Sequence, residues 1–202
     1  MNTRSYILKI IFTLFYAAAF YNCGGNKNDG NPADFISNDS TKLGVEIIDK
    51  DLGVKFFPPK DWVLMQSSLS KKVENRKGIS NPADNFIYQP VYVFLDNQTH
   101  GFLSIGTVST GDSALHNSAV LNYYKGLVSS KYKDNNLSIG SFTNSGITFT
   151  QFKFTKENLI SLKLVFQNSS SEIIQLDYTV PAEFQNSSDS AIRSSIGSIK
   201  LY

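Results

Sequence analysis

Cysteine, histidine and surplus charge are all scarce in this chain of 202 residues. It contains one cysteine, two histidines, and 19 Lys and Arg residues against 17 Asp and Glu residues. A single cysteine excludes a disulfide within the chain, so a folded domain must be held together by its core. Two histidines, without a cysteine or an acidic cluster at ligand spacing, argue against a zinc site. The balanced charge argues against nucleic-acid binding, which normally shows as a basic surplus.

The single cysteine, Cys23, stands at the end of a short basic and apolar leader. The leader carries Arg4 and Lys9, followed by an apolar run over residues 10–20 that only Thr13 interrupts. This run is shorter than the roughly 20 residues of a membrane-spanning helix and fits the core of a signal peptide. Bacterial lipidation forms a thioether on a cysteine that cleavage makes the new N-terminus. The sequence therefore predicts a lipoprotein signal peptide over residues 1–22 and lipidation at Cys23.

The residues before the cysteine depart from the usual lipidation signal, which has Leu, a small residue, and Gly or Ala. Here they are Phe20, Tyr21 and Asn22. Asn directly before the cysteine resembles the relaxed signals of spirochaete lipoproteins. Two alternatives stay open: a secretory leader cleaved elsewhere, with Cys23 as an incidental thiol, or an uncleaved transmembrane helix.

Residues 23–42 are predicted to form a flexible tether, because Gly, Asn, Asp, Ser and Lys predominate and Phe35 and Ile36 are the main apolar exceptions. A coil of this length spans about 25 Å, so the domain would stay near its membrane. The predicted location is the cell envelope, with the lipid anchor in a membrane. Since Gly24 rather than Asp follows the cysteine, the outer membrane is favoured, on its periplasmic face or at the surface.

The remainder, residues 43–202, is predicted to form a single domain of about 160 residues. Alternating apolar and polar residues, separated by turn residues, indicate strands. The predicted strands cover residues 44–48, 52–57, 61–65, 86–95, 101–108, 137–142, 147–154, 159–166 and 172–180. The first two form a hairpin, and the later ones form an antiparallel meander with one wet and one buried face.

Two segments have a helical period instead. Residues 113–132 place apolar residues three and four apart, and residues from about 187 to 198 do the same before the helix stop at Gly197. The predicted class is therefore α+β: an antiparallel sheet packed with helices as an α/β/α sandwich.

Two stretches resemble the PsbP-like family. Residues 53–62, Gly-Val-Lys-Phe-Phe-Pro-Pro-Lys-Asp-Trp, resemble its opening, where a strand ends in a proline turn followed by Trp. Residues 174–200 resemble its last strand, last helix and final short strand. The resemblance spans roughly residues 44–202. It implies an antiparallel sheet packed between helices, in a family that includes extrinsic subunits assisting photosystem II assembly and many bacterial lipoproteins. Family metal sites involve histidines, and neither His100 nor His116 fits one, so no metal or other cofactor is expected.

No catalytic residue is predicted, and the chain is not expected to be an enzyme. His116 lies four residues after Asp112, but no Gly-x-Ser-x-Gly motif accompanies the pair. The candidate contacts for a ligand or partner are aromatic: Trp62, Tyr123 and Tyr124. Core packing is the alternative for Trp62 and for most of the tyrosines.

Three functions follow from these observations. The first is a non-enzymatic interaction or assembly module for another envelope protein, brought close to its partner by the tether. The second is a binding protein for a small apolar or glycan ligand, held in a pocket under the long helix. The third, a hydrolase, has no support from the histidines or acidic residues.

Replacement of the anchor residue tests the predicted lipidation. We expect Cys23→Ala to abolish incorporation of radiolabelled palmitate and to release the chain from the membrane fraction, because only the cysteine thiol can form the thioether. Asn22→Ala, which keeps the cysteine, is the control and should stay labelled. An unlabelled wild-type chain, or a labelled Cys23→Ala variant, would contradict the prediction.

Overall fold

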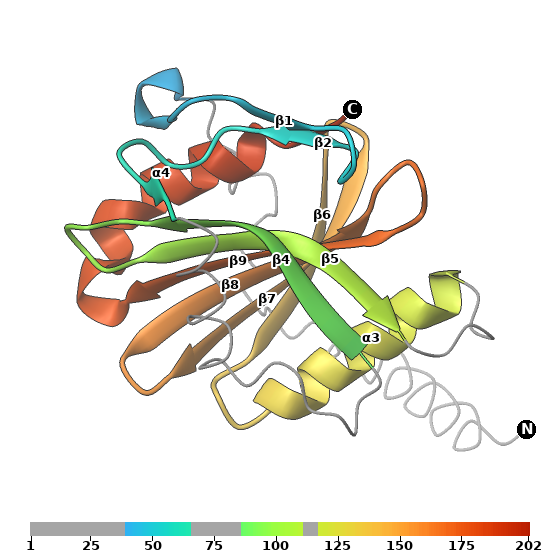
Figure 1. The fold of residues 1–202 in the computed structure, drawn as a ribbon. Helices are drawn as coiled ribbons and strands as arrows, with labels where there is room; N and C mark the ends of the chain where they lie inside the picture. Colours follow the sequence, from blue (N-terminus) through green and yellow to red (C-terminus); the bar gives the residue numbers. More distant parts are fainter. Residues whose placement is uncertain (1–38, 66–85, 111–116) are drawn as a thin grey trace, which may run out of the picture. The chain divides into compact units, whose positions relative to one another are not determined.

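A seven-stranded antiparallel sheet forms the centre of the structure (Figure 1). The computed structural model describes residues 39–65, 86–110 and 117–202. The strand order is β3-β4-β5-β9-β8-β7-β6. The strands are β3 (Val63–Leu64), β4 (Phe86–Leu95), β5 (Phe102–Thr110), β6 (Ser138–Asn144), β7 (Ile147–Lys156), β8 (Leu159–Gln167) and β9 (Ile173–Pro181).

These strands confirm the predicted meander, because β6 to β9 pair in sequence order through short hairpins. The predicted strand over residues 86–95 has the bounds of β4, and most other ends agree within about two residues, the usual uncertainty of such assignments. The strand expected at 61–65 is only the two residues of β3.

A second, three-stranded sheet has the order β1-β2-β10. Strands β1 (Ile47–Asp49) and β2 (Val54–Phe56) form the predicted hairpin. The chain end returns to this sheet as β10 (Lys200–Leu201), which pairs with β2. The amide of Tyr202 then donates to the carbonyl of Gly53 at 2.9 Å, so the end of the chain is held along β2.

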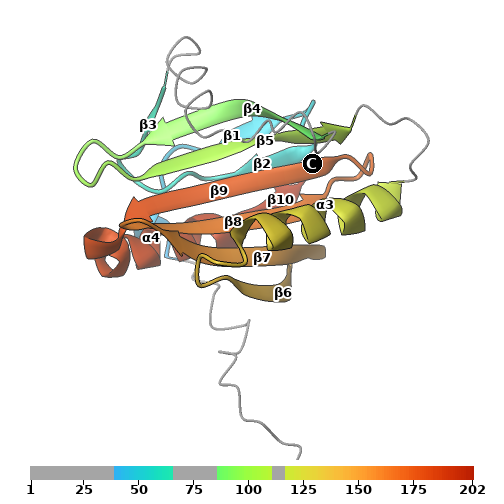
Figure 2. The same cartoon turned by 90° about the horizontal axis from the view of Figure 1, so that it is seen from below.

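Two helices lie on opposite faces of the large sheet (Figure 2). Helix α3 (Asn117–Tyr132) covers one face, and helix α4 (Gln185–Gly197) covers the other together with the small sheet. Short 3₁₀ helices, η2 (Ser40–Lys42) and η4 (Ala182–Phe184), complete the described elements. The α+β class agrees with this arrangement, but an α/β/α sandwich overstates the helices, since a sheet forms part of one outer layer.

The expectation of one wet face on the meander is wrong. Phe149 of β7 is buried on the α4 side, whereas Phe152 and Phe154 are buried on the α3 side. Each face of the sheet therefore has its own apolar cluster. Strand β9 shows this most clearly, because all its residues before Pro181 are buried.

The two helices pack through the residues that their periods predict. In α3, Val120, Tyr124 and Val128 are buried four residues apart on one side. In α4, Ile192 and Ile196 are also four residues apart, and both are buried against the other face of the sheet.

Serine side chains add a polar link between α4 and the sheets. The hydroxyl of Ser195 donates to the carbonyl of Phe57 at 2.6 Å and lies 2.9 Å from the hydroxyl of Tyr178. These bonds satisfy hydroxyl groups that α4 buries against the sheets.

The signal peptide and the beginning of the expected tether lie outside the described residues. The last residues of the expected tether belong to the folded domain instead, because Asp39 caps η2 and the amide of Lys60 donates to the carbonyl of Lys42. Among the described residues, no helix has the length and apolar character that crossing a membrane requires.

A bulge between Pro90 and Tyr92 interrupts the pairing of β4 with β5. It lies where proline removes a backbone donor, and Gly106 of β5 stands opposite. A Cβ atom at Gly106 would lie 2.0 Å from the carbonyl oxygen of Gln89, which is backbone and cannot rotate away.

This contact predicts the effect of adding one methyl group. Gly106→Ala should destabilise the protein by about 3 kcal/mol or more, since the strands must separate to admit the methyl group. The matched control is Gly140→Ala on β6, where a Cβ would meet nothing within 4 Å. The control should be neutral or slightly stabilising. Urea unfolding of both variants measures the difference, and equal midpoints would contradict the close approach.

Candidate functional site

The aromatic residues predicted as contacts lie in very different surroundings. Trp62 is only 9% exposed and packs in the apolar cluster beneath the small sheet, as the core alternative expected. Tyr124 is 6% exposed and faces the large sheet, whereas its neighbour Tyr123 is 54% exposed. Only Tyr123 therefore presents most of its ring to solvent. Cys23 and His116 lie outside the described residues.

Tyr124 leads into a buried polar network on the α3 face of the sheet. Its hydroxyl donates to Oε1 of Gln175, whose Nε2 donates to Oδ2 of Asp177 at 2.9 Å. The Lys163 ammonium closes the chain, donating to both carboxylate oxygens of Asp177 at 2.6 and 2.7 Å. The side chains of Lys163 and Asp177 are 3% and 6% exposed. This is a charge pair inside the domain.

The strands position this pair by simple alternation. Asp177 on β9 is flanked by Leu176 and Tyr178, which point to the α4 side, and it pairs directly with Lys163 on β8. Both charged side chains therefore emerge on the α3 face at one cross-strand position. Sequence reasoning missed them because a polar residue in an alternating strand indicates a wet face. The signal that could have found them was a Lys and an Asp at the centres of two consecutive apolar strands.

Burial next to this network raises the pKa of two tyrosines. Burial, with the negative charge of Asp177, raises the pKa of Tyr132 to about 12. The same two causes raise the pKa of Tyr124 further. Both hydroxyls therefore stay protonated at neutral pH and act as neutral polar groups.

Directly under α3 the structure leaves little room. The cavity between Tyr124, Val128 and Phe86 has a volume of about 30 Å³, enough for one or two waters. Among the described residues, this part of the pocket expected under the long helix is therefore occupied by side chains. A larger cavity of about 230 Å³ lies where α3 ends, and it is lined by Lys131 and Tyr132 of the helix and by the Lys163–Asp177 pair.

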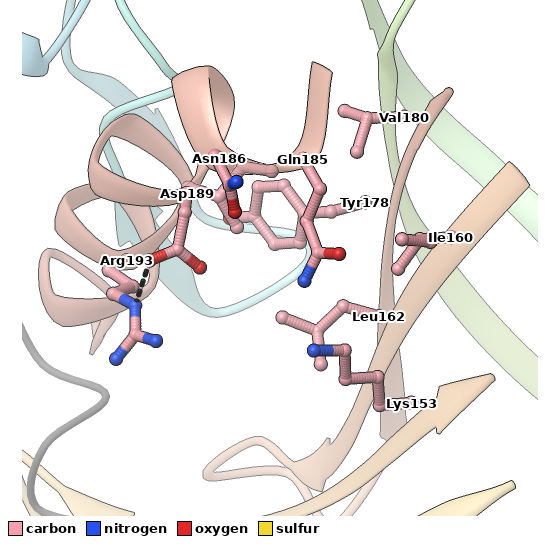
Figure 3. Close-up of a pocket in the computed structure, with 10 residues that line it drawn as sticks. Lys153, Ile160, Leu162, Tyr178, Val180, Gln185, Asn186, Asp189 and Arg193 are labelled. Atoms are coloured by element: carbon pink, nitrogen blue, oxygen red, sulfur yellow. Dashed lines mark hydrogen bonds and ion pairs between the residues drawn. The ribbon is translucent and has the colours of Figure 1, made fainter. Parts of the chain in front are cut away.

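A second cavity, of about 180 Å³, lies on the opposite face beside α4 (Figure 3). Most of its apolar lining comes from the sheet, and Ile192 of α4 adds to it; the sheet residues are Ile160 and Leu162 of β8, and Tyr178 and Val180 of β9. Its polar lining comes from Lys153 of β7 and from Gln185, Asn186, Asp189 and Arg193 of α4. In the close-up, the side chains of Gln185 and Lys153 point toward the same space, from α4 and from β7.

No three His, Cys, Asp or Glu side chains of the described part lie close enough together to hold a metal ion. His100 lies in the turn between β4 and β5 with a left-handed backbone, and its amide donates to the carbonyl of Asp96. Asp49 is the acidic residue at the end of β1. Its carboxylate accepts hydrogen bonds from the hydroxyl of Tyr92 and from the amide of Leu52, both at 2.8 Å.

Comparisons with known proteins address the fold only. No protein-family model matches the chain, and no curated protein matches its sequence. It is similar to the solution structure of cyanobacterial PsbP (CyanoP) from Synechocystis sp. PCC 6803, with a TM-score of 0.48 and 13% identity over 82% of this chain and 96% of that one. It is also similar to PA94 of Pseudomonas aeruginosa, a protein of unknown function, with a TM-score of 0.39 and 9% identity over 76% and 93% of the two chains.

The first of these likenesses is to a member of the family that the sequence resembles, and at a TM-score below 0.5 it does not establish that fold for this chain. At such identities and TM-scores, neither likeness transfers an activity, a ligand or a partner to this chain. Neither tests lipidation at Cys23.

The buried ion pair makes a sharp prediction for stability. Lys163→Met should lower the free energy of unfolding by about 3 to 5 kcal/mol, because Asp177 is left charged and buried without its cation. The double variant Lys163→Met, Asp177→Leu should be more stable than this single variant, since it removes both charges. The control is Asp189→Asn, which breaks the more exposed Arg193–Asp189 pair and should lower the free energy of unfolding by less than about 1 kcal/mol. Additive losses in the double variant, measured by urea unfolding, would contradict the role assigned to the pair.

Proposed function

We propose that the chain is a lipid-anchored, non-enzymatic module of the cell envelope, which docks onto another envelope protein and supports its assembly. Cys23 is the proposed anchor, and the outer membrane is the favoured location. The tether keeps the domain near membrane partners, so a modest intrinsic affinity is sufficient. Nucleic acid is not a proposed partner.

The observation that carries this proposal is the outer edge of β6. Among the described strands, β6 is the last on its side of the sheet, and it pairs with β7 through seven residues without a register shift. Its first four residues, Ser138 to Ser141, are exposed. Edge strands usually carry charges, prolines or bulges that block further pairing, and Ser-Ile-Gly-Ser-Phe-Thr-Asn has no charge and no proline.

An extended segment of a partner protein suits this edge best. An added strand would use the outward backbone N–H and C=O groups of β6 for affinity. Ile139 is 52% exposed and lies beside Phe152 of β7, so it offers the added strand an apolar cross-strand contact. We therefore propose strand addition at β6 as the mode of docking.

Site-specific photo-crosslinking in native membranes tests this mode. A photoreactive residue in place of Ser138 should crosslink one reproducible envelope protein, whereas the same residue in place of Val45, which is 81% exposed, should not. Ile139→Lys should abolish the crosslink, because a charge next to the edge opposes strand addition. The matched control is Ile48→Lys on β1, where the isoleucine is 51% exposed, and it should leave the crosslink intact. A crosslink that survives Ile139→Lys would overturn the proposed mode.

A second candidate function is binding of a small apolar or glycan ligand. The cavity beside α4 supports it, because an apolar wall with a few convergent polar groups is typical of small-molecule sites. The same membrane preparation distinguishes the two functions. A chain that crosslinks no protein but carries a small molecule in its native mass spectrum would favour the ligand over the protein partner.

A further inference from the structure

The cavity beside α4 combines an apolar wall with hydrogen-bonding side chains. Besides the apolar residues of β8, β9 and α4, its lining includes Lys153, Gln185 and Asn186. Among the described residues, none of these three side chains takes part in a hydrogen bond or an ion pair. Gln185 and Lys153 point toward the same space (Figure 3). The cavity therefore offers converging polar groups to a ligand.

These polar groups suit hydroxyls better than a purely apolar molecule. Each of the amides of Gln185 and Asn186 carries both donors and an acceptor. A hydroxyl also donates and accepts, so neighbouring hydroxyls on one ligand can pair with both sides of an amide. An apolar ligand would cover the same groups without offering them a partner, which costs binding free energy.

The charge of the lining favours a neutral ligand. Arg193 donates to Asp189 at 2.5 Å, so the charges of these two residues compensate each other. Lys153 is the other charged residue of the lining, and it is only half-buried. Water screens a single charge at such a position, so it gives an anion little advantage. Its ammonium still provides donors for ligand oxygens.

The size of the cavity fits one ring. Its volume of about 180 Å³ compares with the roughly 150 Å³ of an engineered cavity that binds benzene. Asn186 is exposed, so the lining reaches the surface there and leaves room for ring substituents. A pyranose matches this arrangement, because its C–H groups form an apolar face and its hydroxyls form a polar rim.

We propose that this cavity binds one neutral pyranose unit of a glycan. The C–H face of the sugar lies against Ile160 and Leu162, and its hydroxyls bond to Gln185, Asn186 and Lys153. The proposal rests on the second candidate function given above, and it selects a glycan rather than an apolar molecule as the ligand.

Saturation-transfer NMR of the intact protein tests this assignment. The probes are the methyl glycosides of glucose, galactose and mannose, with cyclohexanol as a six-membered ring that has one hydroxyl. At least one glycoside should bind saturably and about tenfold more tightly than cyclohexanol, since it makes additional hydrogen bonds. Equal or tighter binding of cyclohexanol would overturn the sugar assignment and leave the second candidate function standing. Absence of binding by all four probes would overturn both the sugar assignment and this cavity as the ligand site.

A pair of matched glutamine variants locates the bound sugar. Gln185→Leu should weaken binding of the best glycoside about fivefold, the effect of losing one hydrogen bond, and should change the affinity for cyclohexanol by less than about twofold. The control is Gln89→Leu, at an exposed position of β4 that does not line the cavity, and it should change neither affinity by more than about twofold. Equal effects of the two variants on the glycoside, or an equal loss of both ligands in Gln185→Leu, would overturn the assignment.

Discussion

Burial of the central sheet on both faces is the constraint on which the described structure depends, and the Lys163–Asp177 ion pair makes the second buried face possible. The α4 face is apolar along β8 and β9, so it packs like any protein core. The α3 face carries a lysine and an aspartate in the middle of the same strands. A buried charge is tolerated only when it is paired and hydrogen-bonded. Here each charge neutralises the other, and Gln175 links the carboxylate to Tyr124 of α3.

The surfaces available for binding follow from where this layered packing ends. Helix α3 stops at Tyr132, and the sheet beyond it is left open as a cavity beside the ion pair. On the other face, the start of α4 stands off the sheet and leaves the second cavity. The sheet itself ends at β6 in a strand without charges. The proposed binding surfaces therefore lie at one end of α4 and at the edge of the sheet, because side chains fill the described space between the layers.

Much of the fold could be predicted because strands and helices leave local patterns. Alternation identified β4 and β6 to β9, and the helical period identified α3 and α4. The prediction failed where a pattern has two physical causes. Thr150, Lys163 and Gln175 alternate with apolar residues as a wet face would, yet all three are buried. Trp62 illustrates the same ambiguity, because an aromatic residue after a proline turn suits either a contact surface or a core.

The sequence by itself determined which segments are strands or helices, excluded an internal disulfide, and predicted an envelope lipoprotein with its anchor at Cys23. The tertiary structure alone decided which polar residues are buried, that Lys163 meets Asp177, and where the cavities open. The physical reason is that alternation shows that a strand has two different faces, but not what packs against either of them. That depends on contacts between segments far apart in the chain, such as Tyr124 with Gln175 and Ser195 with Phe57.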